Sequence, residues 1–155
     1  MKELVDLLIS KNKTISTMES CTGGCLVNEI TNIDNSSKVI LFSAVTYSNE
    51  YKIRMGVSKD TIDKYSVYSE EVAKEMSYRI SLFTNSDYGV GITGKLKKTD
   101  ENNLSGDDDL VYISIYDKGN DNYLTKKIKV TYENRIDNKK QVINEAIEML
   151  NNILK

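Results

Sequence analysis

A glycine-rich turn, Ser20 to Gly24, joins two segments of different periodicity, and this junction constrains the fold more than any other feature. Thr14 to Met18 is a short run rich in β-branched residues, which favours a strand. Residues from about 22 to 32 carry apolar side chains at helical spacing. A strand that passes through a tight turn into a helix is a unit of α/β domains. The turn also exposes the Ser20 hydroxyl at a helix N-terminus, where unpaired amides can bind an anion or an oxyanion.

The rest of the chain continues this alternation and ends with a hairpin and a helix. The nearly continuous apolar run from Lys38 to Tyr47 predicts a strand that is covered on both faces. Residues 95–109 lack apolar periodicity and predict a long loop. The remaining patterns predict helices at about 2–12, 48–55, 59–65, 70–84 and 136–154, and strands at 87–93, 110–116 and 123–132. Together they predict one three-layer α/β domain over residues 1–155, a mixed β-sheet flanked by helices.

Composition narrows the classes of function. The net charge of −2 gives no electrostatic reason to expect nucleic acid or an anionic membrane as a partner. No apolar run approaches transmembrane length, and the N-terminus does not resemble a signal peptide. Cys21 and Cys25 are the only cysteines and there is no histidine, so we expect no metal site. We interpret the two thiols as small packing residues in a reducing cytoplasm.

The absence of histidine also limits how Ser20 can become a nucleophile. Tyr47 and Lys52 stand at a strand-to-helix junction and can supply a base. A lysine with an ordinary pKa of about 10.4 needs about 4–5 kcal/mol to be neutral at pH 7, which burial or a nearby cation must supply. Alternatively, Tyr47 relays the proton and a cationic Lys52 stabilises it. The residues alone do not choose between these two schemes.

Each candidate also has an ordinary structural explanation. A serine before Thr-Gly-Gly is usually a helix cap, and a tyrosine at a helix start is usually a packing residue. Lys52 would ordinarily be a solvated surface charge, Thr93 a strand end and Arg135 a surface arginine. On these residues taken one by one, the serine turn could belong to a purely structural α/β domain.

Three segments taken together resemble successive motifs of the CinA C-terminal domain family, which comprises the nicotinamide-nucleotide amidases. They are Thr17 to Gly24, Val45 to Glu50 with Lys52, and Gly91 to Gly94. Val67 to Ala73 also matches the opening of the family's longer helix. The resemblance spans nearly the whole chain and corresponds to the stand-alone form, without the N-terminal nucleotide-processing domain of larger members.

The resemblance implies an activity and its catalytic residues. Ser20 would be the nucleophile, Tyr47 and Lys52 would activate it, and Thr93 would assist. The implied reaction converts nicotinamide mononucleotide to nicotinate mononucleotide and ammonia without a cofactor, in pyridine-nucleotide salvage. The resemblance also implies a homodimer.

It implies substrate-binding residues as well. By the logic of acyl transfer, helix N-terminal amides near Thr22, Gly23 and Gly24 would hold the oxyanion. Asn49 would contact the substrate. Arg135 is the candidate for the substrate phosphate, because a guanidinium can donate two parallel hydrogen bonds to it.

One segment departs from the family pattern. After Thr93-Gly94 the family continues with Ile-Ala-Gly-Pro and a glycine-rich stretch, whereas this chain reads Lys95 to Asp100. The lysines at 95, 97 and 98 could supply positive charge in place of a backbone that approaches a phosphate, or the loop could simply be solvated. This departure leaves a second hypothesis open, a catalytically altered or inactive relative that binds a nucleotide or a protein.

Overall fold

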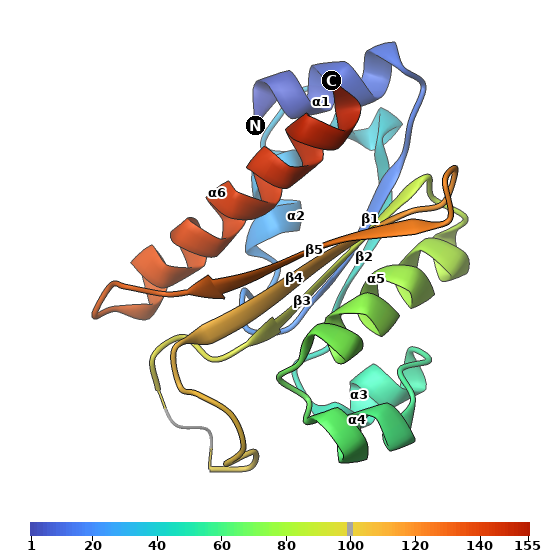
Figure 1. The fold of residues 1–155 in the computed structure, drawn as a ribbon. Coiled ribbons are helices and arrows are strands. Elements are labelled where there is room, and N and C mark those ends of the chain that lie inside the picture. Colours follow the sequence, from blue (N-terminus) through green and yellow to red (C-terminus); the bar gives the residue numbers. More distant parts are fainter. Residues whose placement is uncertain (99–100) are drawn as a thin grey trace.

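A five-stranded mixed sheet forms the centre of the molecule, with the strand order β2-β1-β3-β4-β5 (Figure 1). The structure is a computed structural model and describes residues 1–98 and 101–155. Strand β1 pairs in parallel with β2 and β3, and β4 pairs antiparallel with β3 and β5. The strands are β1 Ile15–Glu19, β2 Ile40–Val45, β3 Tyr88–Gly94, β4 Leu110–Asp117 and β5 Asn122–Lys129.

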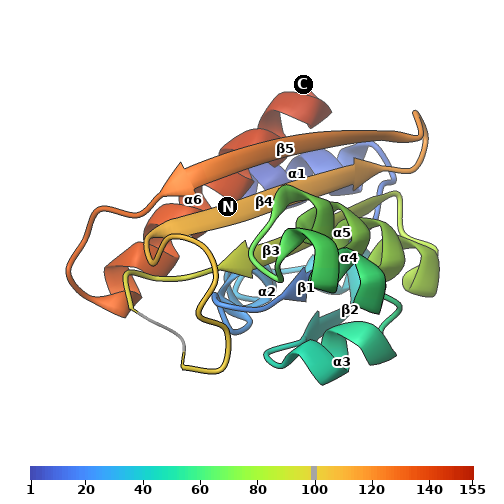
Figure 2. The ribbon, with the colours of Figure 1, turned by 60° about the horizontal axis from the view of Figure 1, so that its bottom comes forward.

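Helices cover both faces of this sheet. One face carries α1 (Lys2–Ser10), α2 (Cys25–Thr31) and α6 (Arg135–Leu154). The other carries α5 (Glu70–Thr84), with α3 (Asn49–Arg54) and α4 (Lys59–Tyr65) beside it, as Figure 2 shows from a second direction. A short 3₁₀ helix, Ser36–Lys38, precedes β2. The sequence prediction of a three-layer α/β domain with a mixed sheet is confirmed.

Each helical layer has its own apolar core. Side chains of α1, α2 and α6, such as Leu8, Leu26 and Val142, pack together with one face of the sheet. On the other face, Met76 and Ile80 of α5 pack against residues such as Met18. Burial of these fully enclosed side chains is the main force that holds the helices on the sheet.

Helix α5 lies unusually close to β3, and glycine allows it. An added Cβ at Gly91 would lie 2.3 Å from the carbonyl oxygen of Ala73, so no other residue fits without movement of the helix. Ser69 caps the start of α5, because its hydroxyl accepts a hydrogen bond of 3.2 Å from the Val72 amide.

The expectation of a doubly covered strand at 38–47 is wrong. Strand β2 is an edge strand, and Leu41 and Val45 are 72% and 50% exposed. The apolar side chains of β2 are therefore not all buried within one copy of the chain. Phe42 is also exposed and packs against Phe83, with ring centroids 5.2 Å apart.

The described parts of the predicted loop, residues 95–98 and 101–109, contain no helix or strand. Residues 99–100, which belong to the same predicted loop, lie outside the described residues.

Candidate active site

A pocket of about 540 Å³ opens at the carboxyl ends of β1, β2 and β3. Ser20 follows β1, Tyr47 follows β2 and Lys95 follows β3, and all three line it. After β1 the chain passes to one face of the sheet through α2, and after β2 it passes to the other face through α5. Ligands of open α/β sheets bind at such switch points. A volume of this size suits a small organic molecule.

Backbone hydrogen bonds to both neighbouring strands fix the Ser20 turn. The Ser20 amide donates to the Ile92 carbonyl of β3 at 3.0 Å, and the Thr46 amide beyond β2 donates to the Glu19 carbonyl at 2.9 Å. The Ser20 side chain is only 6% exposed, at the floor of the pocket. The hydroxyl is therefore held at a defined position.

A fully buried carboxylate, that of Glu19, supports the turn from below. It accepts hydrogen bonds from the Leu26 and Val27 amides at 3.1 and 3.0 Å and from the Thr22 hydroxyl at 2.6 Å. Glu19 thus occupies the N-terminal end of α2, where an anion is favoured. Sequence reasoning quoted this residue as part of a motif but gave it no role.

The turn also shows which backbone amides are already engaged. The Gly23 amide donates to the Ser20 carbonyl at 3.0 Å, and the Cys25 amide donates to the Thr22 carbonyl at 3.2 Å. In the described part of the chain, the amides of Cys21, Thr22 and Gly24 take no part in the backbone hydrogen bonds that hold the turn, and of these three residues Cys21 lines the pocket. Gly23 and Gly24 adopt φ values of +63° and +90°, which glycine accepts without strain, and neither lines the pocket.

Lys52 lies beneath Ser20 as its direct hydrogen-bond partner. Its Nζ is 2.9 Å from Ser20 Oγ and donates to the Thr46 carbonyl at 2.7 Å. The side chain is 1% exposed, although α3 is otherwise a solvated helix. Ser48 caps α3 through a 3.3 Å hydrogen bond from the Tyr51 amide, and this places Lys52 one turn later on the inner side. The amine is therefore at a distance at which it can exchange a proton with the Ser20 hydroxyl.

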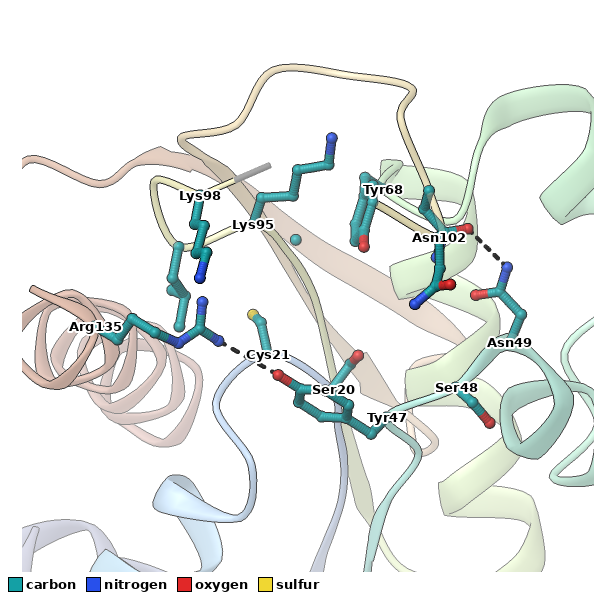
Figure 3. Close-up of a pocket in the computed structure, with 13 residues that line it drawn as sticks. Ser20, Cys21, Tyr47, Ser48, Asn49, Tyr68, Lys95, Lys98, Asn102 and Arg135 are labelled. Carbon is teal, nitrogen blue, oxygen red and sulfur yellow. Dashed lines mark hydrogen bonds between the residues drawn. The ribbon is translucent and has the colours of Figure 1, made fainter. Parts of the chain in front are cut away.

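Tyr47 faces a different partner. Its side chain is 65% exposed, and its hydroxyl accepts a hydrogen bond of 3.4 Å from Nη2 of Arg135 (Figure 3). Of the two bases considered from the sequence, the described structure therefore pairs Lys52 with Ser20 and pairs Tyr47 with Arg135.

Two other candidates occupy contrasting positions. Thr93 is fully buried, and its hydroxyl donates to the Val67 carbonyl at 3.0 Å, so it supports the chain behind the pocket. Asn49 lines the pocket, and its side-chain amide donates to Asn103 Oδ1 at 2.9 Å. Asn49 thereby ties α3 to the loop that follows β3.

Several lining residues were not assigned from the sequence. Tyr68 and Asn102 form a polar and aromatic side of the pocket, as Figure 3 shows. Asn103 lines the same pocket. Lys95 is 3% exposed, and its Nζ lies 3.1 Å from Asp108 and 5.1 Å from the centre of the Tyr68 ring. Loop residues have no periodicity that could reveal such convergence, although Tyr68 belongs to a quoted motif.

Cys21 lies next to Ser20, and its thiol is not activated. Burial raises the pKa of its thiol to about 12, and the charges of Lys52 and Arg135 offset this only in part. The thiolate is the reactive form of cysteine, so this side chain stays inert at neutral pH. The thiol belongs to the packing of the turn, as the sequence suggested.

Residues 1–98 and 101–155 contain neither a candidate metal cluster nor a helix that could span a membrane. No group of three or more His, Cys, Asp or Glu side chains in these residues could hold a metal ion. None of their helices is both long and apolar enough to cross a membrane.

The fold and the site define a three-layer α/β protein with a buried Ser–Lys pair in a switch-point pocket. A family model described as CinA C-terminal domain matches residues 1–154, and the chain belongs to this family. A protein of Clostridium kluyveri named as a competence-damage inducible protein is 44% identical over 117 residues. The match covers 73% of this chain and 28% of that protein, so this chain corresponds to about a quarter of its length.

Solved structures share the same fold. A CinA superfamily protein from Klebsiella pneumoniae superimposes with a TM-score of 0.89 at 23% identity, covering 99% of this chain and 94% of that one. The competence/damage inducible protein CihA from Agrobacterium tumefaciens gives a TM-score of 0.86 at 26% identity, with 99% and 95% covered. These likenesses support the α/β architecture over the full length of the chain.

Proposed function

We propose that this chain is an amidohydrolase that converts nicotinamide mononucleotide to nicotinate mononucleotide and ammonia. The observation that carries the proposal is the 2.9 Å contact between Lys52 Nζ and Ser20 Oγ at the floor of the pocket. A buried amine at hydrogen-bond distance from a serine hydroxyl has the geometry of a nucleophile with its base. The family resemblance supplies the substrate, and residues 1–155 form the amidase domain.

In the first half of the reaction, neutral Lys52 accepts the hydroxyl proton while Ser20 Oγ attacks the carboxamide carbon. The amide of Cys21, a residue that lines the pocket, donates to the carbonyl oxygen as it becomes an oxyanion. Lys52 then gives its proton to the departing nitrogen. The C–N bond breaks, ammonia leaves, and an ester joins Ser20 to the nicotinate group.

In the second half, Lys52 accepts a proton from a water molecule, and the resulting hydroxide attacks the ester carbon. The bond to Ser20 breaks and its oxygen recovers the proton from Lys52. Nicotinate mononucleotide leaves the pocket. Glu19 and Thr93 touch no reacting atom in this scheme, and they position the turn and the end of β3.

Ammonia release tests the proposal. Purified protein is given nicotinamide mononucleotide, and ammonia is measured with an enzyme-coupled assay beside a Ser20→Ala variant and a Ser10→Ala control on the exposed end of α1. We expect turnover by the wild type and by Ser10→Ala, and loss of it in Ser20→Ala. Mass spectrometry of a rapidly quenched reaction should also find the acyl group on Ser20.

Two results would reject this function. Turnover that survives Ser20→Ala would exclude the serine mechanism. Binding of the nucleotide, seen by calorimetry, without ammonia release would support the alternative of a family member that only binds.

We further propose that the chain works as a homodimer in the cytoplasm. Exposed apolar side chains on the edge strand β2, Leu41 and Val45 among them, favour pairing with a second copy. Cys21 and Cys25 are free thiols, as a reducing compartment maintains them. Light scattering coupled to size exclusion tests the dimer, with Leu41→Glu expected to yield monomers.

A further inference from the structure

The three lysines that replace the family's glycine-rich stretch have different surroundings. Lys95 turns into the pocket wall and pairs with Asp108, and Lys97 pairs with Glu133. Lys98 lines the pocket and has no acidic partner among the described residues. Only one lysine of this segment therefore presents its charge to the pocket without a carboxylate.

Arg135 approaches the same end of the pocket from α6. It is the first residue of that helix, where the helix dipole disfavours a cation. In the described chain it has no carboxylate partner and donates only to the Tyr47 hydroxyl. A guanidinium in this position adds to the positive potential of the helix end, which favours an anionic ligand.

Figure 3 shows the charged ends of Lys98 and Arg135 pointing toward one another. Two cations that converge without an acid repel each other, and an anion between them removes that cost. Because the Tyr47 oxygen accepts from Arg135, the phenolic proton remains free to donate to the same anion.

We propose that Lys98 and Arg135 form a phosphate clamp at this end of the pocket, with Tyr47 as a third donor. This rests on the proposed function, since the clamp would bind the phosphate monoester of the nucleotide while its carboxamide reaches Ser20. The planar guanidinium of Arg135 can donate two hydrogen bonds to the phosphate, and the ammonium of Lys98 adds a compact positive charge. In this chain, the charged side chains of Lys98 and Arg135 would thus bind the phosphate in place of a glycine-rich backbone.

Ribose 5-phosphate is a suitable probe because it carries the phosphate and lacks the carboxamide. Its binding to the full chain is measured by calorimetry for wild type, Lys98→Ala and Lys97→Ala. Lys97 is the matched control, since it is one residue away with the same charge and pairs with Glu133. We expect Lys98→Ala to weaken binding on the order of tenfold and Lys97→Ala to change it less than about twofold.

Turnover provides the second arm of the test. In ammonia assays, Lys98→Ala should lower kcat/KM for nicotinamide mononucleotide and leave it unchanged for nicotinamide riboside, which lacks the phosphate. Equal losses of ribose 5-phosphate binding in both lysine variants, or no loss in Lys98→Ala, would overturn the clamp. Lys98-dependent binding without ammonia release would uphold the clamp while rejecting the amidase function.

Discussion

Lys52 Nζ and Ser20 Oγ lie 2.9 Å apart although the two residues are separated by 32 positions in the chain. The strand order creates this contact. Ser20 follows the central strand β1, and Lys52 lies on the short helix that follows the neighbouring strand β2. Parallel strands bring their carboxyl ends to one edge of the sheet, so Lys52 lies directly beneath Ser20 at the pocket.

Lys52→Met should abolish most of the proposed activity without harming the fold. We expect kcat to fall about 10²–10⁴-fold, the usual contribution of a positioned base. Thermal unfolding should change little or shift upward, because a buried amine is replaced by an apolar chain of similar length. The assay is ammonia release, with a thermal melt of each variant.

Lys59→Met on α4 is the matched control, because that lysine is exposed and pairs with Asp63. It should keep full activity. If Lys52→Met kept its activity while Tyr47→Phe lost it, the tyrosine relay would replace Lys52 as the source of the base.

Glu19→Gln should destabilise the turn and lower turnover together. The Leu26 and Val27 amides donate to different oxygens of the carboxylate, and a glutamine presents an NH2 donor in place of one of these acceptors. We expect a loss of about 2–3 kcal/mol in the free energy of unfolding, measured by urea titration. Since Glu19 is next to Ser20, kcat should fall more than KM rises.

The control for this change is Glu29→Gln, an exposed carboxylate on the same helix. Its free energy of unfolding should stay within about 0.5 kcal/mol of wild type. Equal stability of the two variants would mean that the Glu19 carboxylate does not hold the turn.

Local patterns predicted most of the fold. The helical periodicity of residues 70–84 predicted α5 with its observed bounds, Glu70–Thr84. The prediction that β2 is covered on both faces was wrong, because an apolar strand at the edge of a sheet can have the same composition as a buried strand. Burial depends on neighbouring strands, which periodicity does not describe.

The site was less accessible to sequence reasoning than the fold. Six-residue α3 buries only Lys52, so its pattern indicated a solvated lysine. Tyr68 and Asn103 reach the pocket from loops, where no spacing rule applies. The absence of histidine pointed to Tyr47 and Lys52 as bases for Ser20, and the family resemblance joined the three residues in one site.

Asp87 should make stability depend on pH in the acid range. Desolvation raises the pKa of this carboxyl, but hydrogen bonds from Lys13 and Thr14 outweigh it and hold the pKa below the ordinary 3.8. A carboxyl with a lower pKa in the folded state stabilises the fold above pH 3.8 and loses that contribution as pH falls through the folded value.

Asp87→Asn should therefore be less stable than wild type near neutral pH, and the difference should vanish in strong acid. Urea titrations across the acid range check this. Asp6→Asn removes an exposed pair with Lys2 and should show almost no difference at any pH. A gap between wild type and Asp87→Asn that persists in strong acid would contradict the assignment.

Cys21 should resist alkylation in the native protein. Burial raises the pKa of its thiol to about 12, so the thiolate is scarce near neutrality. Cys25 is half-buried and should react first with iodoacetamide. Peptide mass spectrometry locates the label, and both cysteines should react in urea. Native labelling of Cys21 as fast as in urea would show that the turn opens.

Gly91→Ala should test the close packing of α5 on β3. The added Cβ would lie 2.3 Å from the Ala73 carbonyl oxygen and 2.7 Å from the Ser77 nitrogen, so the helix must move. We expect a loss of about 3 kcal/mol in the free energy of unfolding, measured by urea titration. Gly119→Ala is the control, because its nearest neighbour would be an Asp117 oxygen at 3.4 Å, an ordinary contact. Gly119→Ala should stay within about 0.5 kcal/mol of wild type, and equal midpoints for both variants would refute the close approach.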